Sequence, residues 1–182
     1  MKTRRVVTGK DETGRSVFLS DDVAPLAHDF EHLPGHGFVR VWRTEPGGVL
    51  DAKADEPQTL TGPLLPAPDG TSFFLVSVSP DSVALSPTFD PVAVGGEFAT
   101  YTPDLAATFE PDAPGMHTTD TADYVIVLDG EVWLEVDDGA ETRLTRGDVV
   151  VQLGARHAWR NKTGRPATIA VVMVGARRAA GG

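Results

Sequence analysis

The stretches Gly115–Asp123 (GMHTTDTAD) and Gly147–Asn161 (GDVVVQLGARHAWRN) each place one histidine, His117 or His157, beside runs in which apolar and polar residues alternate. This alternation is the pattern of half-buried β-strands. Turn residues separate the runs at short intervals, and helical periodicity is almost absent. The second half of the chain therefore predicts an antiparallel sandwich or barrel, with the two histidines as the first candidates for a site.

The same pattern predicts the other elements. Residues 4–8 and 16–20 flank a polar turn and predict a β-hairpin, and the proline-rich stretch 45–70 predicts a long loop or lid. Asp129-Gly130 is the strongest signal for a tight hairpin. A weak helix is expected at Asp22–Phe30. Strands are expected at Gly37–Thr44, Ser72–Ser79, Tyr124–Asp129, Glu131–Asp137, Arg143–Leu144, Asp148–Gln152, His157–Asn161 and Thr168–Val174, with weaker candidates at Ala93–Tyr101 and Ala106–Glu110.

The layout of the two histidine stretches resembles the paired motifs of the cupin superfamily, in which a small β-barrel holds a metal between histidines and one carboxylate. The resemblance spans roughly residues 71–175 and is specific over 115–161. It implies an all-β fold, a double-stranded β-helix or jelly-roll-like barrel over 71–175. The hairpin, strand and proline-rich loop of residues 1–70 would pack on the barrel or on a partner subunit, and 176–182 would be a disordered tail.

Strand parity groups the candidate site residues, because residues two apart face the same side of a strand. His117, Thr119 and Asp123 share one face of the first stretch, and His157, Trp159 and Asn161 share a face of the second. A barrel interior that collects His117, Asp123 and His157 would offer two imidazoles and a carboxylate to a metal, with positions left open for substrate. Thr119, Trp159 and Asn161 are the expected substrate-binding residues.

The chain departs from the cupin pattern at two ligand positions. Thr119 stands where the family has its second histidine, and a hydroxyl there is expected to hydrogen-bond a ligand or water. Asp123 stands for the family's glutamate, and its shorter side chain reaches less far into the barrel. Asp120 is the rival carboxylate, because a bulge at residues 118–121 would turn it inward. The expected catalytic residues are Asp123, His157 and Asp120.

Composition limits the cofactor and the partners. The chain of 182 residues has a formal net charge of −10, which disfavours nucleic acid and anionic lipid as partners. It has no cysteine, so disulfides, thiolate metal sites and cysteine nucleophiles are excluded. The expected cofactor is a divalent metal (Zn, Fe, Mn or Ni), or none. A cytoplasmic homodimer is expected, and the richness in Ala, Gly, Val, Arg and Asp is typical of a GC-rich bacterial genome.

Three functions remain open at this stage. The first is a small-molecule enzyme of the cupin type with metal-assisted lyase or isomerase chemistry, that is, dehydration, decarboxylation or isomerisation of a carbonyl- or carboxylate-bearing metabolite. The second is a non-haem Fe(II) dioxygenase that uses the same three ligands. The third is a non-catalytic cupin that binds a small molecule. If no metal binds, His157 and Asp123 are expected to act as an acid–base pair.

Overall fold

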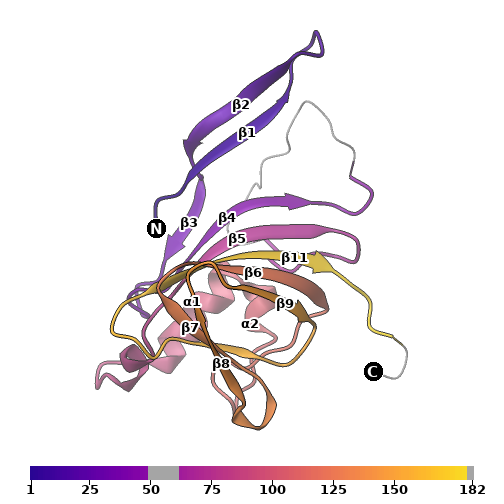
Figure 1. Cartoon of the computed structure of the whole chain (residues 1–182). Coiled ribbons are helices and arrows are strands. Elements are labelled where there is room, and N and C mark those ends of the chain that lie inside the picture. Colours follow the sequence, from indigo (N-terminus) through magenta and orange to yellow (C-terminus); the bar gives the residue numbers. More distant parts are fainter. Residues whose placement is uncertain (49–61, 180–182) are drawn as a thin grey trace.

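The computed structural model describes residues 1–48 and 62–179, so half of the predicted loop 45–70, residues 49–61, lies outside the described residues. Within them, the strands form three antiparallel sheets (Figure 1). The strands are β1 (Arg4–Lys10), β2 (Ser16–Val23), β3 (Leu26–Asp29), β4 (Gly37–Thr44), β5 (Thr71–Val78), β6 (Thr121–Asp129), β7 (Glu131–Glu135), β8 (Glu141–Thr145), β9 (Val149–Leu153), β10 (Ala158–Arg160) and β11 (Ala167–Gly175). The antiparallel β architecture predicted from the sequence is confirmed.

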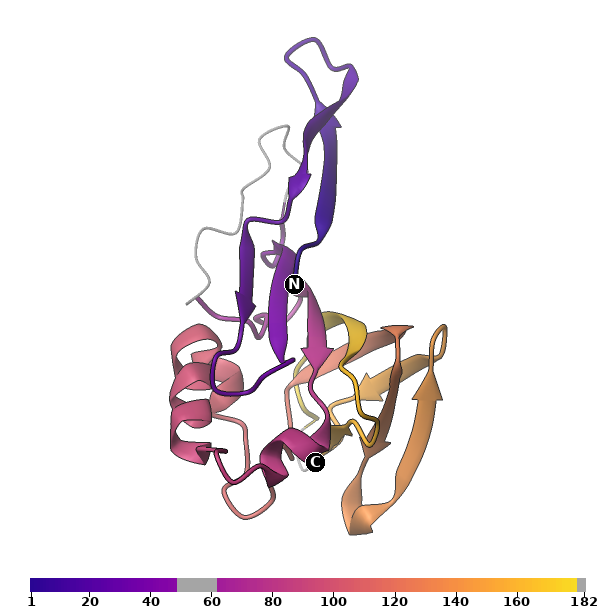
Figure 2. The same ribbon diagram turned by 90° about the vertical axis from the view of Figure 1, so that its left-hand side faces the viewer.

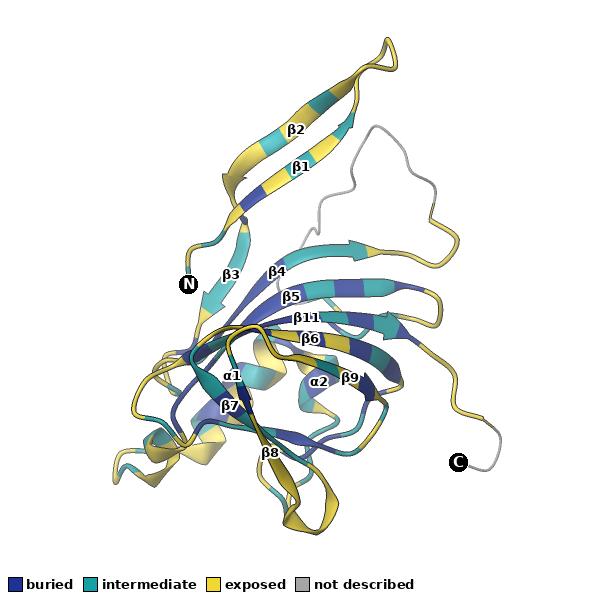
Figure 3. Cartoon of the chain, viewed as in Figure 1, coloured by how far each residue is buried: buried dark blue, intermediate teal, exposed yellow. Residues whose placement is uncertain are grey.

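The two larger sheets enclose the core. One has the strand order β3-β4-β5-β11-β6-β9 and the other β10-β7-β8. Alternate residues of β6 and β11 are buried, and they meet the inner side chains of β7 and β8 in one apolar cluster. Figure 3 shows this as dark blue stripes on the strands of the body, whereas the β1–β2 hairpin is largely exposed. The strands of the second half of the chain thus form the two walls of the barrel.

The N-terminal strands have two different roles: one pair extends the larger sheet, and the other forms a hairpin that projects from it. Strands β3 and β4 extend that sheet beyond β5, whereas the β1–β2 hairpin projects away from it (Figure 2). The base of the hairpin is fixed by Ala24, which is buried against β4 and β5, and by the Arg5 guanidinium over the Trp42 ring. Its two strands carry apolar side chains that remain in water, among them Phe18.

Two helices replace strands that the sequence pattern predicts. Residues expected as strand at 93–101 belong to helix α1 (Pro91–Tyr101), and the candidate strand at 106–110 follows helix α2 (Pro103–Ala106). The Asp90 carboxylate caps α1 by accepting hydrogen bonds from the Val92 and Ala93 backbone N–H groups, and Pro91 occupies the first turn. This Asp-Pro start signal is a regular feature of helix N-termini. Two glycines within the helix mask its periodicity.

The expected helix at 22–30 is also wrong. Strand β2 ends at Val23 and β3 covers Leu26–Asp29, with Pro25 between them. Proline inside a helix removes a hydrogen bond and clashes with the preceding turn, so the chain takes the extended alternative. Short 3₁₀ turns at Asp81–Leu85 and Asp137–Gly139 complete the described secondary structure.

The predicted hairpin at Asp129-Gly130 is wrong as well. Strand β6 pairs with β11 and β9, whereas β7 pairs with β10 and β8, so the chain crosses from one sheet to the other at Gly130. Gly130 has φ +77°, and a Cβ placed on it would lie 2.8 Å from the Ala167 Cβ. A glycine is therefore required here because the two sheets approach closely. In the sequence this glycine looks the same as one required by a hairpin turn.

Candidate functional site

The two histidines predicted as site residues lie side by side. Each backbone N–H donates to the other's carbonyl, at 2.9 Å from His117 and 3.0 Å from His157, which forms an isolated antiparallel bridge. The ring centroids are 4.2 Å apart, and both side chains are buried. Phe109 contacts the His117 ring edge-on, and Trp159 contacts the His157 ring in the same way. The pair is thus fixed by its backbone and enclosed by aromatic rings.

Backbone carbonyls set the tautomer of both imidazoles. The His117 Nδ1 lies 3.0 Å from the Gly115 carbonyl oxygen, and the His157 Nδ1 lies 2.9 Å from that of Ala155. A carbonyl can only accept, so each Nδ1 carries the hydrogen and each neutral ring keeps a lone pair on Nε2. Burial lowers the pKa of both rings, and the neighbouring His117 lowers that of His157 further, to about 4. The site therefore presents two neutral Nε2 atoms, each of which can accept a hydrogen bond or a proton.

The predicted alternation around His117 holds without interruption. From residue 117 to residue 127 every second residue is buried, and Asp120 lies between two buried threonines. Asp120 therefore points outward, and its exposed carboxylate pairs with Arg178. The structure places Asp123, not Asp120, on the interior face with His117. The expectation that a bulge would bring Asp120 to the histidines is wrong.

Three side chains of this face form a hydrogen-bonded row. The Thr119 and Thr121 hydroxyls are 2.7 Å apart, and Thr121 in turn hydrogen-bonds the Asp123 carboxyl. The Thr119 hydroxyl is therefore already engaged by a protein group. The row runs along the interior face from beside His117 to Asp123, so a proton donor or acceptor at one end can influence the other.

Asp123 and Gln152 are buried polar residues with unused hydrogen-bonding capacity. They are cross-strand partners on β6 and β9, and they are 3% and 5% exposed. Neither the Asp123 Oδ1 nor the Gln152 Nε2 has a hydrogen-bond partner. Burial raises the pKa of Asp123 to about 6, against a smaller opposing effect of the Thr121 hydroxyl. Unsatisfied buried polar atoms are costly, which makes this pair a candidate for contact with a ligand or a bound water.

The other two expected substrate-binding residues differ in their surroundings. Trp159 packs against the apolar cluster and touches the His157 ring, so it forms a wall of the site. Asn161 is fully buried and satisfied: its amide donates to the Val78 and Arg165 carbonyls, and its oxygen accepts from Thr163. The substrate-binding role expected for Asn161 is therefore wrong, because the side chain holds a turn.

The arrangement does not supply the three-ligand metal set. Among residues 1–48 and 62–179, no three His, Asp or Glu side chains converge closely enough to share a metal ion. The histidine pair has the tautomer that a metal ligand needs, since Nδ1 is held by a carbonyl and Nε2 is free. The Asp123 carboxylate does not join it. The donor set as arranged fits two imidazoles and no third ligand, so the predicted metal is not confirmed.

Sequence reasoning missed two residues of the site, Gln152 and Phe109. Gln152 is the one polar residue in the run VVVQL of β9, and it stands near the place where the family pattern has a proline. A single amide among the apolar residues of this run was the available signal. Phe109 bridges to His117 through the backbone and contacts its ring. Nothing in the local pattern marks that contact, which depends on the preceding helices.

The part of the chain that contains these residues matches a known family. Residues 105–174 match the family model of the cupin domain. The chain carries a cupin domain. The matched residues include the histidine pair, Asp123, Gln152 and every strand from β6 to β10.

Similar curated proteins come from fungi. The chain is 52% identical to the phomopsin biosynthesis cluster protein C′ of Diaporthe leptostromiformis over 48 residues, a stretch that covers 26% of this chain and 25% of that protein. It is 48% identical over 48 residues to the oryzines biosynthesis cluster protein J of Aspergillus oryzae (26% and 27%). It is 43% identical over 49 residues to the cupin-domain-containing oxidoreductase virC of Hypocrea virens (27% and 25%). The matches span about a quarter of each relative. They do not support the bacterial source suggested by composition.

Solved structures show a looser likeness. A putative ethanolamine utilization protein Q from Salmonella typhimurium LT2 aligns with a TM-score of 0.43 at 10% identity, over 97% of this chain and 99% of that one. A Cupin 2 conserved barrel domain protein from Salinispora arenicola CNS-205 aligns with a TM-score of 0.40 at 16% identity, over 79% and 80%. Within the described residues, no helix has both the length and the apolar character needed to span a membrane.

Proposed function

We propose that this cupin domain is a small-molecule enzyme that moves protons inside the barrel, in a dehydration, decarboxylation or isomerisation of a carbonyl- or carboxylate-bearing metabolite. The observation that carries the proposal is the shared interior of the histidine pair and Asp123, whose Oδ1 is buried without a partner. The neutral Nε2 atoms of the imidazoles accept a proton or a substrate hydroxyl hydrogen. A carboxyl that titrates near pH 6 can give or take a proton near neutral pH. That three fungal relatives are named for biosynthesis clusters or as an oxidoreductase supports a role in small-molecule chemistry.

The test compares wild type with His157→Gln on a panel of hydroxy acids, keto acids and their decarboxylation products, with metal-stripped and metal-supplemented protein. Glutamine keeps the polarity and much of the volume of histidine but cannot accept a proton, so we expect turnover to be lost while the fold persists. His32→Gln, a change of an exposed histidine, is the matched control. Full turnover by His157→Gln would refute the proposal.

The oxidoreductase name of one relative favours a second candidate, an Fe(II)-dependent oxygenase. The same samples decide between the two. Oxygen uptake that requires added Fe(II) and disappears in His117→Gln and His157→Gln would favour the oxygenase. Turnover by metal-stripped protein without oxygen uptake would favour proton transfer. Ligand binding without turnover under either condition would favour the third function, a non-catalytic cupin that binds a small molecule.

We also propose that the chain forms a homodimer through the outer face of β6 and β9. Six large apolar side chains there are at least 40% exposed on two neighbouring strands, and β9 is the edge of its sheet: Tyr124, Ile126, Leu128, Val149, Val151 and Leu153. An exposed apolar row at a sheet edge is normally covered by another chain. We expect light scattering after gel filtration to give twice the chain mass for wild type and the single mass for Val151→Lys. Val92→Lys, a change of an exposed valine on α1, should stay dimeric. A monomeric wild type would refute the proposal.

A further inference from the structure

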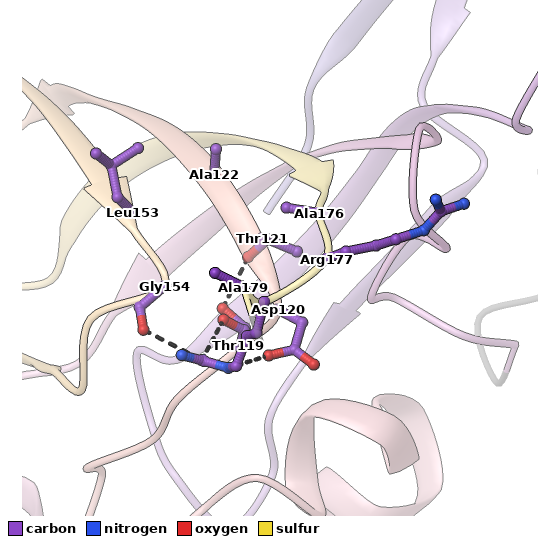
Figure 4. A pocket seen from close by; sticks show the side chains of 10 residues that line it. Thr119, Asp120, Thr121, Ala122, Leu153, Gly154, Ala176, Arg177 and Ala179 are labelled. Atoms are coloured by element: carbon purple, nitrogen blue, oxygen red, sulfur yellow. Dashed lines mark hydrogen bonds and ion pairs between the residues drawn. The ribbon is translucent and has the colours of Figure 1, made fainter. Parts of the chain in front are cut away.

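Two adjoining cavities lie next to the row of hydroxyls and share the residues Thr119, Asp120, Thr121 and Arg178. One, of about 290 Å³, is also lined by the end of β9 and the segment after β11. The other, of about 390 Å³, is also lined by Leu65, Pro66, Thr108 and Thr118. Both volumes are in the range that holds a small metabolite. Figure 4 shows the first cavity, with Thr119, Asp120 and Thr121 gathered on one side and Arg177 extended away from them.

The segment after β11 brings Arg178 between the two cavities. The Ala176 backbone N–H donates to the Asp120 carbonyl at 2.9 Å, which fixes the segment at this point. The Arg178 guanidinium donates to the Asp120 carboxylate and, at 3.2 Å each, to the Thr119 and Gly154 carbonyl oxygens. The Arg178 guanidinium is thus held by two fixed backbone carbonyls and by the exposed Asp120 carboxylate, which another anion can replace.

We propose that the cavities are an anion-binding subsite, in which Arg178 exchanges the Asp120 carboxylate for a carboxylate of the metabolite. This inference rests on the proposed small-molecule function, and it narrows the substrate class to carboxylates. The guanidinium supplies charge-assisted, directional hydrogen bonds to a carboxylate. Thr119 and Thr121 line the same two cavities.

Breaking the existing ion pair between Arg178 and Asp120 costs little free energy. The side chains of Arg178 and Asp120 are 44% and 66% exposed, and exposed ion pairs contribute little to stability. The Arg178 side chain keeps its two carbonyl partners during the exchange, so its position is held.

The subsite is connected to the interior site through the hydroxyl row. Thr119 and Thr121 line both cavities, their hydroxyls are hydrogen-bonded to each other, and Thr121 hydrogen-bonds Asp123. An anion on Arg178 therefore binds beside Thr119, the residue at the far end of the row from the buried Asp123 carboxyl.

The test uses malonate as the probe and its neutral diamide, malonamide, as the uncharged analogue. Two-dimensional NMR titration of the full chain locates the binding site from the backbone signals and gives the dissociation constant, without any turnover. We expect malonate to shift the signals of Thr119, Thr121 and Gly154, and malonamide to bind at least tenfold more weakly. Arg178→Ala should weaken malonate binding about tenfold or more, the effect of losing a charge-assisted hydrogen bond.

Two further variants make the test decisive. Arg165→Ala removes the same charge from an arginine that lines neither cavity, whose side chain is 62% exposed and pairs with Asp129, and it should change affinity by less than twofold. Asp120→Asn removes the competing carboxylate and should strengthen malonate binding. Equal effects of Arg178→Ala and Arg165→Ala, or equal binding of malonate and malonamide, would overturn the subsite. Neither result depends on whether His157→Gln keeps turnover, so the two proposals fail separately.

Discussion

Replacing Asp123 by asparagine is expected to stabilise the fold by about 3 kcal/mol at pH 8, while lowering turnover roughly 100-fold or more. The native pKa of about 6 lies above the usual value of 3.8 because the carboxyl is buried. A carboxyl with a raised pKa favours the folded state below pH 3.8, and this advantage is lost as the pH rises through 6. At pH 8 the fold therefore contains a buried charge, which the amide of asparagine removes.

Denaturant unfolding of both proteins at pH 8 and pH 4 measures this effect. The stabilisation by Asp123→Asn should be large at pH 8 and shrink towards pH 4, where the wild-type carboxyl is protonated. Asp120→Asn, which changes an exposed carboxylate three residues away, should alter stability by less than about 1 kcal/mol at either pH. If Asp123→Asn is less stable than wild type at pH 8, the carboxyl does not carry the burial penalty described above.

Acidification is expected to destabilise the protein through the imidazoles whose pKa burial lowers, and His36→Leu should remove about 2 kcal/mol of that loss between pH 7 and pH 5. His36 is half-buried at the turn that precedes β4. Its ring lies among Phe30, Phe38 and Phe98, and its Nε2 is buried without a partner. Burial lowers its pKa from 6.5 to about 4.

The direction of this pH effect depends on which protonation state of the ring the folded protein favours. A histidine with a lowered pKa favours the folded state above pH 6.5, and that contribution is lost as the pH falls towards 4, because the unfolded chain binds the proton more readily. His157 has a pKa of the same value and should produce a similar loss. Unfolding midpoints at pH 7 and pH 5 test this. His32→Leu, at an exposed position, should keep the wild-type pH dependence, and an unchanged dependence in His36→Leu would contradict the assignment.

The strands could be predicted because each is a local pattern. The alternation that runs from residue 117 into β6 is visible in the sequence, and it places His117 and Asp123 on one face without knowledge of the fold. Helix α1 was missed because its start signal, Asp90-Pro91, was outweighed by two internal glycines. The crossing at Gly130 was mistaken for a hairpin because a glycine forced by a close contact and a glycine forced by a turn look the same in one dimension.

The pairing of the two histidines could be predicted, whereas the hydrogen bonds around them could not. Parity and the family resemblance pointed to His117 and His157 as neighbours, but the tautomer of each imidazole depends on backbone carbonyls two residues away. The role of Asn161 was misassigned because its partners, the Val78 and Arg165 carbonyls, come from two other segments of the fold. The contribution of Arg178 is equally non-local, since it arrives from the segment after the last strand.

The unbroken alternation from residue 117 to residue 127 also limits how this region can change by mutation. The same register points Val125 and Val127 into the core and Thr119 and Asp123 into the site. Deleting one residue near Asp120 would turn the side chains on one side of the deletion to the opposite face. The region can therefore accept exchanges of side chain, such as threonine or aspartate at former ligand positions, but not insertions or deletions. Its chemistry can drift by substitution while its length stays fixed.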